Sequence, residues 1–266
     1  MAIFGFIGTG NMGGALARAM RKNVSGEDLL LANRTPQKAD ALATEIGCKV
    51  SNNKTIAETA DYIFLGVKPQ MMAGLLEEIA PALSARSDRF ILVTMAAGLT
   101  MARIREMAGG DYPVIRIMPN TPSSIGEGMI LYSTSDDVTS RELEVFLLAM
   151  LGAGRLSSLP EHLIDAGSAV SGCGPAFVDL FIEALADGGV ACGLPRVAAL
   201  EYAAQMVAGS AKLILESGKH PGVLKDAVCS PGGTTIQGVR ALEEGGFRGT
   251  VMNAVIKAYE KNFDLK

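Results

Sequence analysis

The sequence predicts an α/β domain with a Rossmann-like, mostly parallel sheet at residues 1–160, followed by an all-α helical dimerisation domain at residues 161–266. In the first part, short apolar runs alternate with helical periodicity, and several runs lack polar alternation, as is typical of parallel strands covered on both faces. In the second part, only helices separated by Gly and Pro remain. A glycine-rich turn directly after the first apolar run supports this fold class.

Strands are predicted at apolar runs rich in Ile, Val, Leu and Phe. They fall at Ala2–Ile7, Leu29–Ala32, Tyr62–Val67, Phe90–Met95, Val114–Met118, Met129–Tyr132 and Arg155–Leu159. Helical spacing lies between them at Gly13–Arg21, Thr35–Glu45, Gln70–Leu83, Thr100–Met107 and Ser140–Leu151. Strands that alternate with helices in this way predict βαβ units.

The stretch Ala176–Leu185 of the second domain is apolar on almost every side. Its polar stripe consists of Asp179, Glu183 and Asp187, at intervals of four residues. A helix with so wide an apolar face must be buried by more than one neighbour. We therefore expect a second subunit to cover it, the alternative being a central helix in a monomeric bundle.

Composition argues against several classes of function. The 24 Lys+Arg against 28 Asp+Glu give a net charge of −4, which does not favour nucleic acid or an anionic membrane as partner. The 48% of hydrophobic residues suffices for a packed core. No apolar run approaches the roughly 18 residues of a membrane span, so we expect a cytoplasmic protein.

The four cysteines stand alone, without a C-x-x-C pair. This pattern favours reduced thiols over a disulfide framework or a zinc site, and we expect no metal. The 31 glycines are the unusual feature of the composition, because they suggest places where the backbone approaches something closely.

The first predicted strand runs into Gly8-Thr9-Gly10-Asn11-Met12-Gly13, and a helix follows. Glycines at this spacing allow a tight turn, close approach of the backbone to a pyrophosphate, and close packing of helix on strand. The helix N-terminus then faces the phosphates. A strand, this turn and a helix in succession predict a dinucleotide site, against the alternative of an incidental glycine turn.

The second strand leads into Asn33, Arg34 and Thr35. An acidic residue here would hold the ribose 2′-hydroxyl of NAD, whereas an amide, a guanidinium and a hydroxyl can accept a 2′-phosphate. The sequence therefore favours NADPH, with NADH still possible as cofactor. The alternative is that Arg34 is a solvated loop residue.

Two further segments follow predicted strands, Val67-Lys68-Pro69 and Ala96-Ala97-Gly98. Ligands of open α/β sheets bind at the carboxyl ends of strands, and small side chains there admit a ribose or nicotinamide ring. For Lys68, a role as an ordinary surface lysine explains the sequence equally well.

The substrate side lacks the usual proton donors. His162 and His220 are the two histidines, and each fits a helix start or a turn. No lysine occurs between the turn Ser171–Pro175 and Lys212. In Ser230-Pro231-Gly232-Gly233-Thr234-Thr235, the turn opens a helix whose amides can bind a carboxylate, although an ordinary capped helix start explains it as well.

Six motifs in order, VKPQ, MAAG, MPNTP, SGCGPAF with EALADGG, HPGVLKDAV and SPGGTT with RALEEGGFR, resemble the pyrroline-5-carboxylate reductase family along essentially the whole chain. The resemblance implies NAD(P)H-dependent reduction of 1-pyrroline-5-carboxylate to L-proline, the final step of proline biosynthesis. It also implies a homodimer through the helical domain, often assembled further into decamers.

The resemblance assigns roles residue by residue. It places the dinucleotide phosphates against Ile7, Gly8, Thr9, Gly10, Asn11 and Met12. It places the adenosine end at Asn33, Arg34, Thr35 and Asn53, and the nicotinamide side at Val67, Lys68, Pro69, Ala96 and Ala97, with Met118, Pro119 and Asn120 nearby. It assigns the substrate to Glu161, Ser230, Gly233, Thr234 and Thr235, with the Ser230–Thr235 turn supplied by the partner subunit. Cys173 and Ala227 depart from the family pattern, and Ala227 lacks one cofactor contact that an Asn makes in some relatives.

A cyclic imine also accounts for the missing acid. It is far more basic than a ketone and can arrive protonated, so hydride transfer needs orientation and one hydrogen bond more than a strong proton donor. Thr235 is the predicted catalytic residue. The open alternatives are a reductase of another cyclic imine acid, a cofactor-sensing regulator, and a purely structural oligomer.

Overall fold

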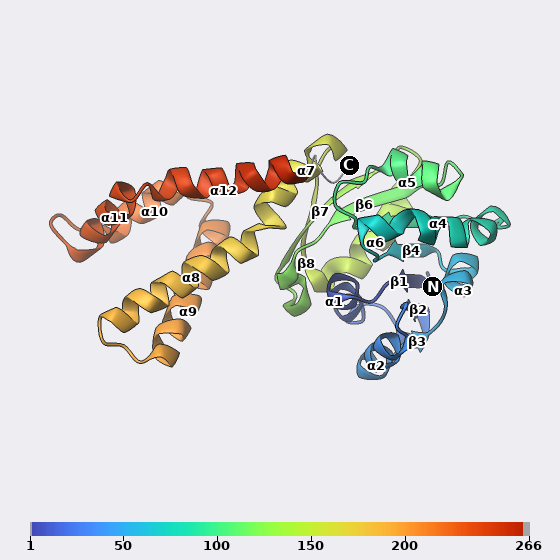
Figure 1. Ribbon diagram of the computed structural model, residues 1–266, viewed down its shortest axis with the longest axis horizontal. Coiled ribbons are helices and arrows are strands. Elements are labelled where there is room, and N and C mark those ends of the chain that lie inside the picture. The colour runs from blue at the N-terminus through green and yellow to red at the C-terminus, as the bar shows by residue number, and fades with distance from the viewer. Residues whose placement is uncertain (1, 263–266) are drawn as a thin grey trace. The chain divides into compact units, whose positions relative to one another are not determined.

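The strands form one eight-stranded sheet in the order β3-β2-β1-β4-β5-β6-β7-β8 (Figure 1). The structure, a computed structural model, describes residues 2–262. The strands are β1 (Phe4–Ile7), β2 (Leu29–Ala32), β3 (Lys49–Val50), β4 (Tyr62–Leu65), β5 (Ile91–Thr94), β6 (Val114–Met118), β7 (Gly128–Thr134) and β8 (Gly154–Ser158). All neighbours are parallel except β6 and β7. The predicted mostly parallel sheet is confirmed.

Helices cover both faces of this sheet (Figure 1). They are α1 (Asn11–Met20), α2 (Pro36–Ile46), α3 (Asn53–Thr59), α4 (Pro69–Ser84), α5 (Met101–Ala108), α6 (Ser140–Met150) and α7 (Glu161–Ser171), with short 3₁₀ turns η1 (Gly26–Asp28), η2 (Thr121–Ile125) and η3 (Leu151–Ala153). Neighbouring residues of one strand enter opposite cores: Phe6 packs with α1, α2 and α6, and Ile7 packs with α3, α4 and α5. This two-sided burial explains the apolar runs without polar alternation.

Two elements are absent from the sequence prediction, β3 and α3. The short strand β3 is exposed and offers no apolar run, and the seven-residue helix α3 depends on its cap, where Asn52 Oδ1 accepts the Thr55 N–H at 2.8 Å. Strand β7 is antiparallel to β6 because η2 alone joins them, which is too short for the crossover that a parallel pair needs.

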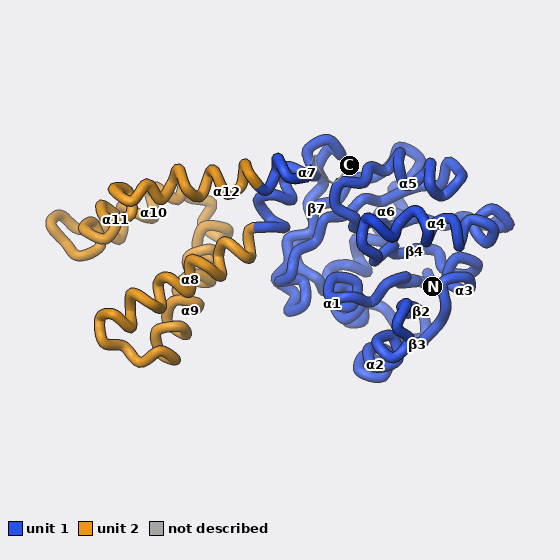
Figure 2. Tube along the Cα trace, viewed as in Figure 1, with its two compact units in different colours: residues 1–173, 258–266 blue, residues 174–257 orange. Residues whose placement is uncertain are grey.

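The chain divides into two compact units, residues 1–173 with 258–266, and residues 174–257 (Figure 2). The sequence places the division at 160/161 instead. Helix α7 lies between these positions and packs on β6 and β7, and therefore it belongs to the first unit.

The second unit is entirely helical among the described residues. Its helices are α8 (Gly174–Ala191), α9 (Arg196–Ser217), α10 (Pro221–Val228), α11 (Thr234–Glu244) and the greater part of α12 (Phe247–Lys261). Helices α8 and α9 pack together, and the rings of Phe181 and Phe247 pack in a tilted arrangement with 5.8 Å between their centroids. Large apolar side chains nevertheless stay exposed, among them Leu180 at 68% and Val197 at 79%. A single chain therefore does not provide the cover predicted for Ala176–Leu185.

One stretch of the described helices, Glu161–Ala191, is long and apolar enough to cross a membrane by length and composition alone. The sequence contains no continuous apolar run of that length. This stretch instead reaches a high mean hydropathy although Gly, Ser and acidic residues are interspersed in it. The break at Gly172 and Cys173 divides it into α7 and α8. Helices that are apolar on most sides also occur at buried protein interfaces, so the composition is compatible with both environments.

Candidate functional site

A cavity of about 730 Å³ opens at the carboxyl ends of β1, β2 and β4. Its walls contain part of the predicted cofactor set: Ile7, Gly8, Gly10, Asn33, Arg34, Thr35, Asn53, Val67 and Lys68. The crevice beyond the carboxyl ends of the strands is where open α/β sheets bind ligands. The structure thus brings the glycine turn and the end of the second strand to one cavity.

The glycine turn is shaped for a group that approaches the backbone. Gly8 has φ of +102°, and a Cβ there would lie 2.6 Å from the Gly66 carbonyl oxygen. A Cβ on Gly13 would lie 2.2 Å from the Gly8 oxygen, so this glycine is required for close packing. A Cβ on Gly10 would meet nothing within 4 Å, and Gly10 caps α1 without a side-chain hydrogen bond. The start of α1 therefore has both the space and the N–H groups that a pyrophosphate needs.

The end of β2 is tied to this turn by Asn33. Its Oδ1 accepts the Thr9 N–H at 3.1 Å, and its Nδ2 donates to the Thr35 carbonyl at 3.0 Å. Arg34 and Thr35 are exposed on the cavity wall, and Lys38 joins them from the first turn of α2. Two cations and a hydroxyl on one wall fit a phosphate ester rather than a free ribose hydroxyl.

Another part of the cavity wall comes from the start and the first three turns of α4. Lys68 is the N-cap residue of α4 and lines the cavity. Asn53 Nδ2 donates to Glu78 Oε1 at 3.0 Å. Sequence reasoning missed several wall residues, namely Lys38, Gly66, Gln70, Met71, Gly74, Leu75 and Glu78. The signal that could have found Lys38 is its place one helical turn after Arg34.

Other predicted cofactor residues do not line this cavity: Thr9, Asn11, Met12, Pro69, Ala96, Ala97 and Asn120. Ala96 is buried, and Ala97 packs beside Met118. Both ends of the buried Asn120 amide are engaged within the protein, since Oδ1 accepts the Met129 N–H and Nδ2 donates to the Ser171 carbonyl, each at 2.9 Å. Asn120 therefore joins the end of β6 to β7 and α7.

The predicted substrate turn lies in the second unit, between α10 and α11. The Gly233 N–H donates to the Ser230 carbonyl at 3.0 Å, and Gly232 has φ of +69°. A Cβ on Gly233 would lie 2.3 Å from Ser230 Oγ, so only glycine fits without a shift. Gly233 caps α11 without a side-chain hydrogen bond, and Thr235 is exposed in the first turn. The amides that open α11 are therefore available to a carboxylate.

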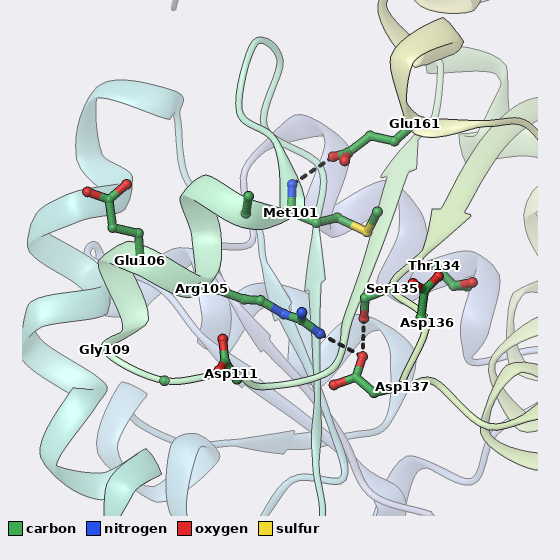
Figure 3. Close-up of a pocket in the computed structure, with 12 residues that line it drawn as sticks. Met101, Arg105, Glu106, Gly109, Asp111, Thr134, Ser135, Asp136, Asp137 and Glu161 are labelled. Atoms are coloured by element: carbon green, nitrogen blue, oxygen red, sulfur yellow. Dashed lines mark hydrogen bonds and ion pairs between the residues drawn. The ribbon is translucent and has the colours of Figure 1, made fainter.

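Glu161 belongs to the first unit, where it lines a hollow of about 870 Å³ between α5 and the end of β7 (Figure 3). Its Oε1 accepts the Met101 N–H at 2.7 Å. In the same hollow, Asp137 accepts from Ser135 and pairs with Arg105, each at 2.6 Å. Burial acts to raise the pKa of the Asp137 carboxyl, but the hydrogen bond from Ser135 and the charge of Arg105 outweigh it and lower that pKa. Asp137 thus belongs to a fixed ion pair.

An open glycine turn on the first strand of a parallel sheet, with a cationic wall after the second strand, defines a dinucleotide-dependent oxidoreductase of Rossmann-like fold. Residues 3–98 match the family described as NADP oxidoreductase, coenzyme F420-dependent, and residues 161–265 match pyrroline-5-carboxylate reductase dimerisation. The chain belongs to the pyrroline-5-carboxylate reductase family: it is 41% identical over 264 residues to that enzyme of Escherichia coli (strain K12), covering 98% of this chain and 97% of the relative.

Other relatives agree over the full length. The pyrroline-5-carboxylate reductase of Pisum sativum is 39% identical, covering 98% of this chain and 95% of its own. Among solved structures, the Plasmodium falciparum pyrroline carboxylate reductase with NADP bound matches with a TM-score of 0.87 and 33% identity, covering 99% of this chain and 98% of the other. That of Coxiella burnetii has a TM-score of 0.91 and 29% identity, covering 100% and 98%.

Proposed function

We propose that this protein reduces 1-pyrroline-5-carboxylate to L-proline with NAD(P)H, the final step of proline biosynthesis. The observation that carries this proposal is the pair of glycine turns at Gly8–Gly13 and Ser230–Thr235, each of which opens a helix without a side-chain cap. One turn suits the phosphates of a dinucleotide and the other suits the carboxylate of a small acid. The family to which the chain belongs acts on such a pair of ligands.

The cofactor fits the cavity of the first unit. Ile7, the glycine turn and the start of α1 hold the phosphates, and Asn33 and Asn53 hold the adenosine end. NADPH is preferred over NADH because Arg34, Thr35 and Lys38 offer charge and hydrogen bonds to a 2′-phosphate. NADPH supplies the hydride when it is bound. The nicotinamide end extends toward Lys68, Pro69 and the loop that carries Ala96 and Ala97.

The substrate is held by the Ser230–Thr235 turn. Its carboxylate accepts hydrogen bonds from the amides of Gly233, Thr234 and Thr235, supported by the partial positive charge at the start of α11. The Thr235 hydroxyl faces the ring nitrogen and orients the protonated imine. Because the imine arrives protonated, the site needs no strong acid.

The working unit is a homodimer through the helical domain. Exposed side chains such as Leu180, Val197 and Leu215 would bury their surface against the same region of a second copy. In that arrangement the partner subunit supplies the Ser230–Thr235 turn to each cofactor, as the family resemblance implies, and dimers can assemble further into decamers. The protein acts in the cytoplasm, without a nucleic-acid or membrane partner.

The direct test mixes the protein, NADPH and 1-pyrroline-5-carboxylate and follows the absorbance of the reduced nicotinamide. Consumption of NADPH that depends on the imine and yields proline supports the proposal. Binding of NADPH without consumption would identify a cofactor-sensing protein instead. Faster turnover of a six-membered cyclic imine acid than of the five-membered one would identify a related reductase.

A further inference from the structure

A buried cation sits in the middle of β6. The side chain of Arg116 is 2% exposed and faces α7, where its Nη2 lies 2.5 Å from Asp165 Oδ1 and its Nη1 lies 3.5 Å from Glu161 Oε1. Within residues 2–262, the buried Nε has no hydrogen-bond partner. The two carboxylates of α7, one helical turn apart, therefore provide the neutralisation that a buried guanidinium requires.

Glu161 uses the same oxygen for a second contact. Oε1 accepts the N–H of Met101, the first residue of α5, at 2.7 Å. This N–H is among those that a helix leaves without an intrahelical partner, and a carboxylate is favourable at that helix end. Thr100 caps the same end through Arg103 N–H at 3.2 Å. Glu161 thus links the start of α5 to Arg116.

The loop that precedes α5 also makes an apolar contact with α7, at Ala97. Ala97 packs against the small cluster of Met118, Leu131 and Ile164, and Ile164 belongs to α7. The segment 96–100 is therefore fixed to α7 twice, through apolar contact at Ala97 and through the Glu161 hydrogen bond at Met101.

We propose that Arg116 and Glu161 are positioning residues, which fix the loop 96–100 and thereby the place of the nicotinamide ring. This inference rests on the proposed function, in which Ala96 and Ala97 line the nicotinamide. Arg116 holds the Glu161 carboxylate toward Met101 N–H, and Glu161 sets where α5 begins. The adenosine half of the dinucleotide depends on other loops, those of Gly8–Gly13 and Asn33–Thr35.

The test compares two ligands by their dissociation constants from the full chain. NADPH carries the nicotinamide ring, and 2′-phospho-ADP-ribose carries the same adenosine end without it. In Glu161→Ala, we expect the Kd for NADPH to rise at least tenfold and the Kd for 2′-phospho-ADP-ribose to stay within twofold. In Glu161→Gln, whose amide oxygen can still accept the Met101 N–H, the Kd for NADPH should stay within threefold of the unaltered chain.

Arg116→Lys tests the other end of the link. A lysine keeps the charge but loses the fork that reaches both carboxylates, so NADPH binding should weaken while binding of 2′-phospho-ADP-ribose stays within twofold. If Arg116→Lys prevents folding, the comparison of Glu161→Ala with Glu161→Gln tests the proposal by itself. Glu106→Ala is the matched control, because Glu106 lines the same hollow but pairs with the exposed Arg103.

Two results would overturn the inference. Equal weakening of both ligands in Glu161→Ala would mean a general loss of structure. An unchanged Kd for NADPH, with a raised KM for the imine alone, would mean that Glu161 contacts substrate directly. A chain that binds NADPH but does not reduce the imine would contradict the proposed function and leave these binding results valid.

Discussion

Arg116 on β6 and Asp165 on α7 form an ion pair, with 2.5 Å between Nη2 and Oδ1, in which both side chains are largely withdrawn from solvent. The pair involves a helix that contributes Ile164 to the small apolar cluster with Met118 and Leu131. Polar contacts therefore help to hold α7 in place, at Glu161 to α5, at Asp165 to β6 and at Ser171 to Asn120.

We expect Asp165→Ala to lower the free energy of unfolding by about 3 kcal/mol, because removal of one partner leaves a buried charge without compensation. Urea denaturation followed by circular dichroism measures this. Asp165→Asn should lower the free energy of unfolding by less, since the amide oxygen of the asparagine can still accept a hydrogen bond from Arg116. An unchanged midpoint in Asp165→Ala would show that water or another carboxylate neutralises Arg116.

Arg34→Asp should weaken NADPH binding about tenfold or more and change NADH binding less than twofold, because only NADPH carries the 2′-phosphate. Titration of nicotinamide fluorescence gives both dissociation constants. Arg103→Asp, a charge reversal at an exposed site on α5, controls for the change in net charge. Equal effects on the two dinucleotides would refute the assignment of Arg34 to the 2′-phosphate.

Much of the first unit could be predicted because its signals are local. A strand buried on both faces must be apolar throughout, and a backbone turn around a pyrophosphate must be glycine-rich. The strand Val114–Met118 is found with the predicted bounds. By contrast, Lys38 and Glu78 are single polar residues on α2 and α4, and whether each faces the cavity depends on how its helix packs.

Even where the position of a side chain is predicted correctly, its hydrogen-bond partners depend on the tertiary structure. Asn120 follows β6, where a ligand contact is reasonable, yet its amide is taken up by Met129 and Ser171. The role of Arg116 could not be predicted from the sequence. An arginine inside an apolar strand needs a buried partner, and the fold supplies that partner as Asp165 from another element. In the proposed function, the glycine turn meets the Ser230–Thr235 turn of a second subunit, and no periodicity within one chain encodes such a meeting.

Thr235→Ala should lower kcat/KM for 1-pyrroline-5-carboxylate by roughly tenfold or more, about 1.4 kcal/mol, through loss of the hydrogen bond to the ring nitrogen. Steady-state kinetics with saturating NADPH measure it. Thr235→Ser keeps the hydroxyl and should recover most of the loss. If Thr235→Ala has the kinetics of the unaltered enzyme, the hydroxyl has no role in orienting the imine.

Gly10→Ala separates ligand binding from folding at the glycine turn. A Cβ at Gly10 meets nothing within 4 Å, and its φ of −68° suits alanine, so thermal stability should fall only by the small cost of alanine at an N-cap. The added methyl group would nevertheless occupy the space through which a pyrophosphate approaches the start of α1, and the Kd for NADPH should rise at least tenfold.

Gly13→Ala is the matched contrast, because its Cβ would lie 2.2 Å from the Gly8 carbonyl oxygen and should lower stability directly. Calorimetric scans and NADPH titrations of both variants distinguish the two effects. Full NADPH affinity in Gly10→Ala would place the dinucleotide phosphates away from this turn.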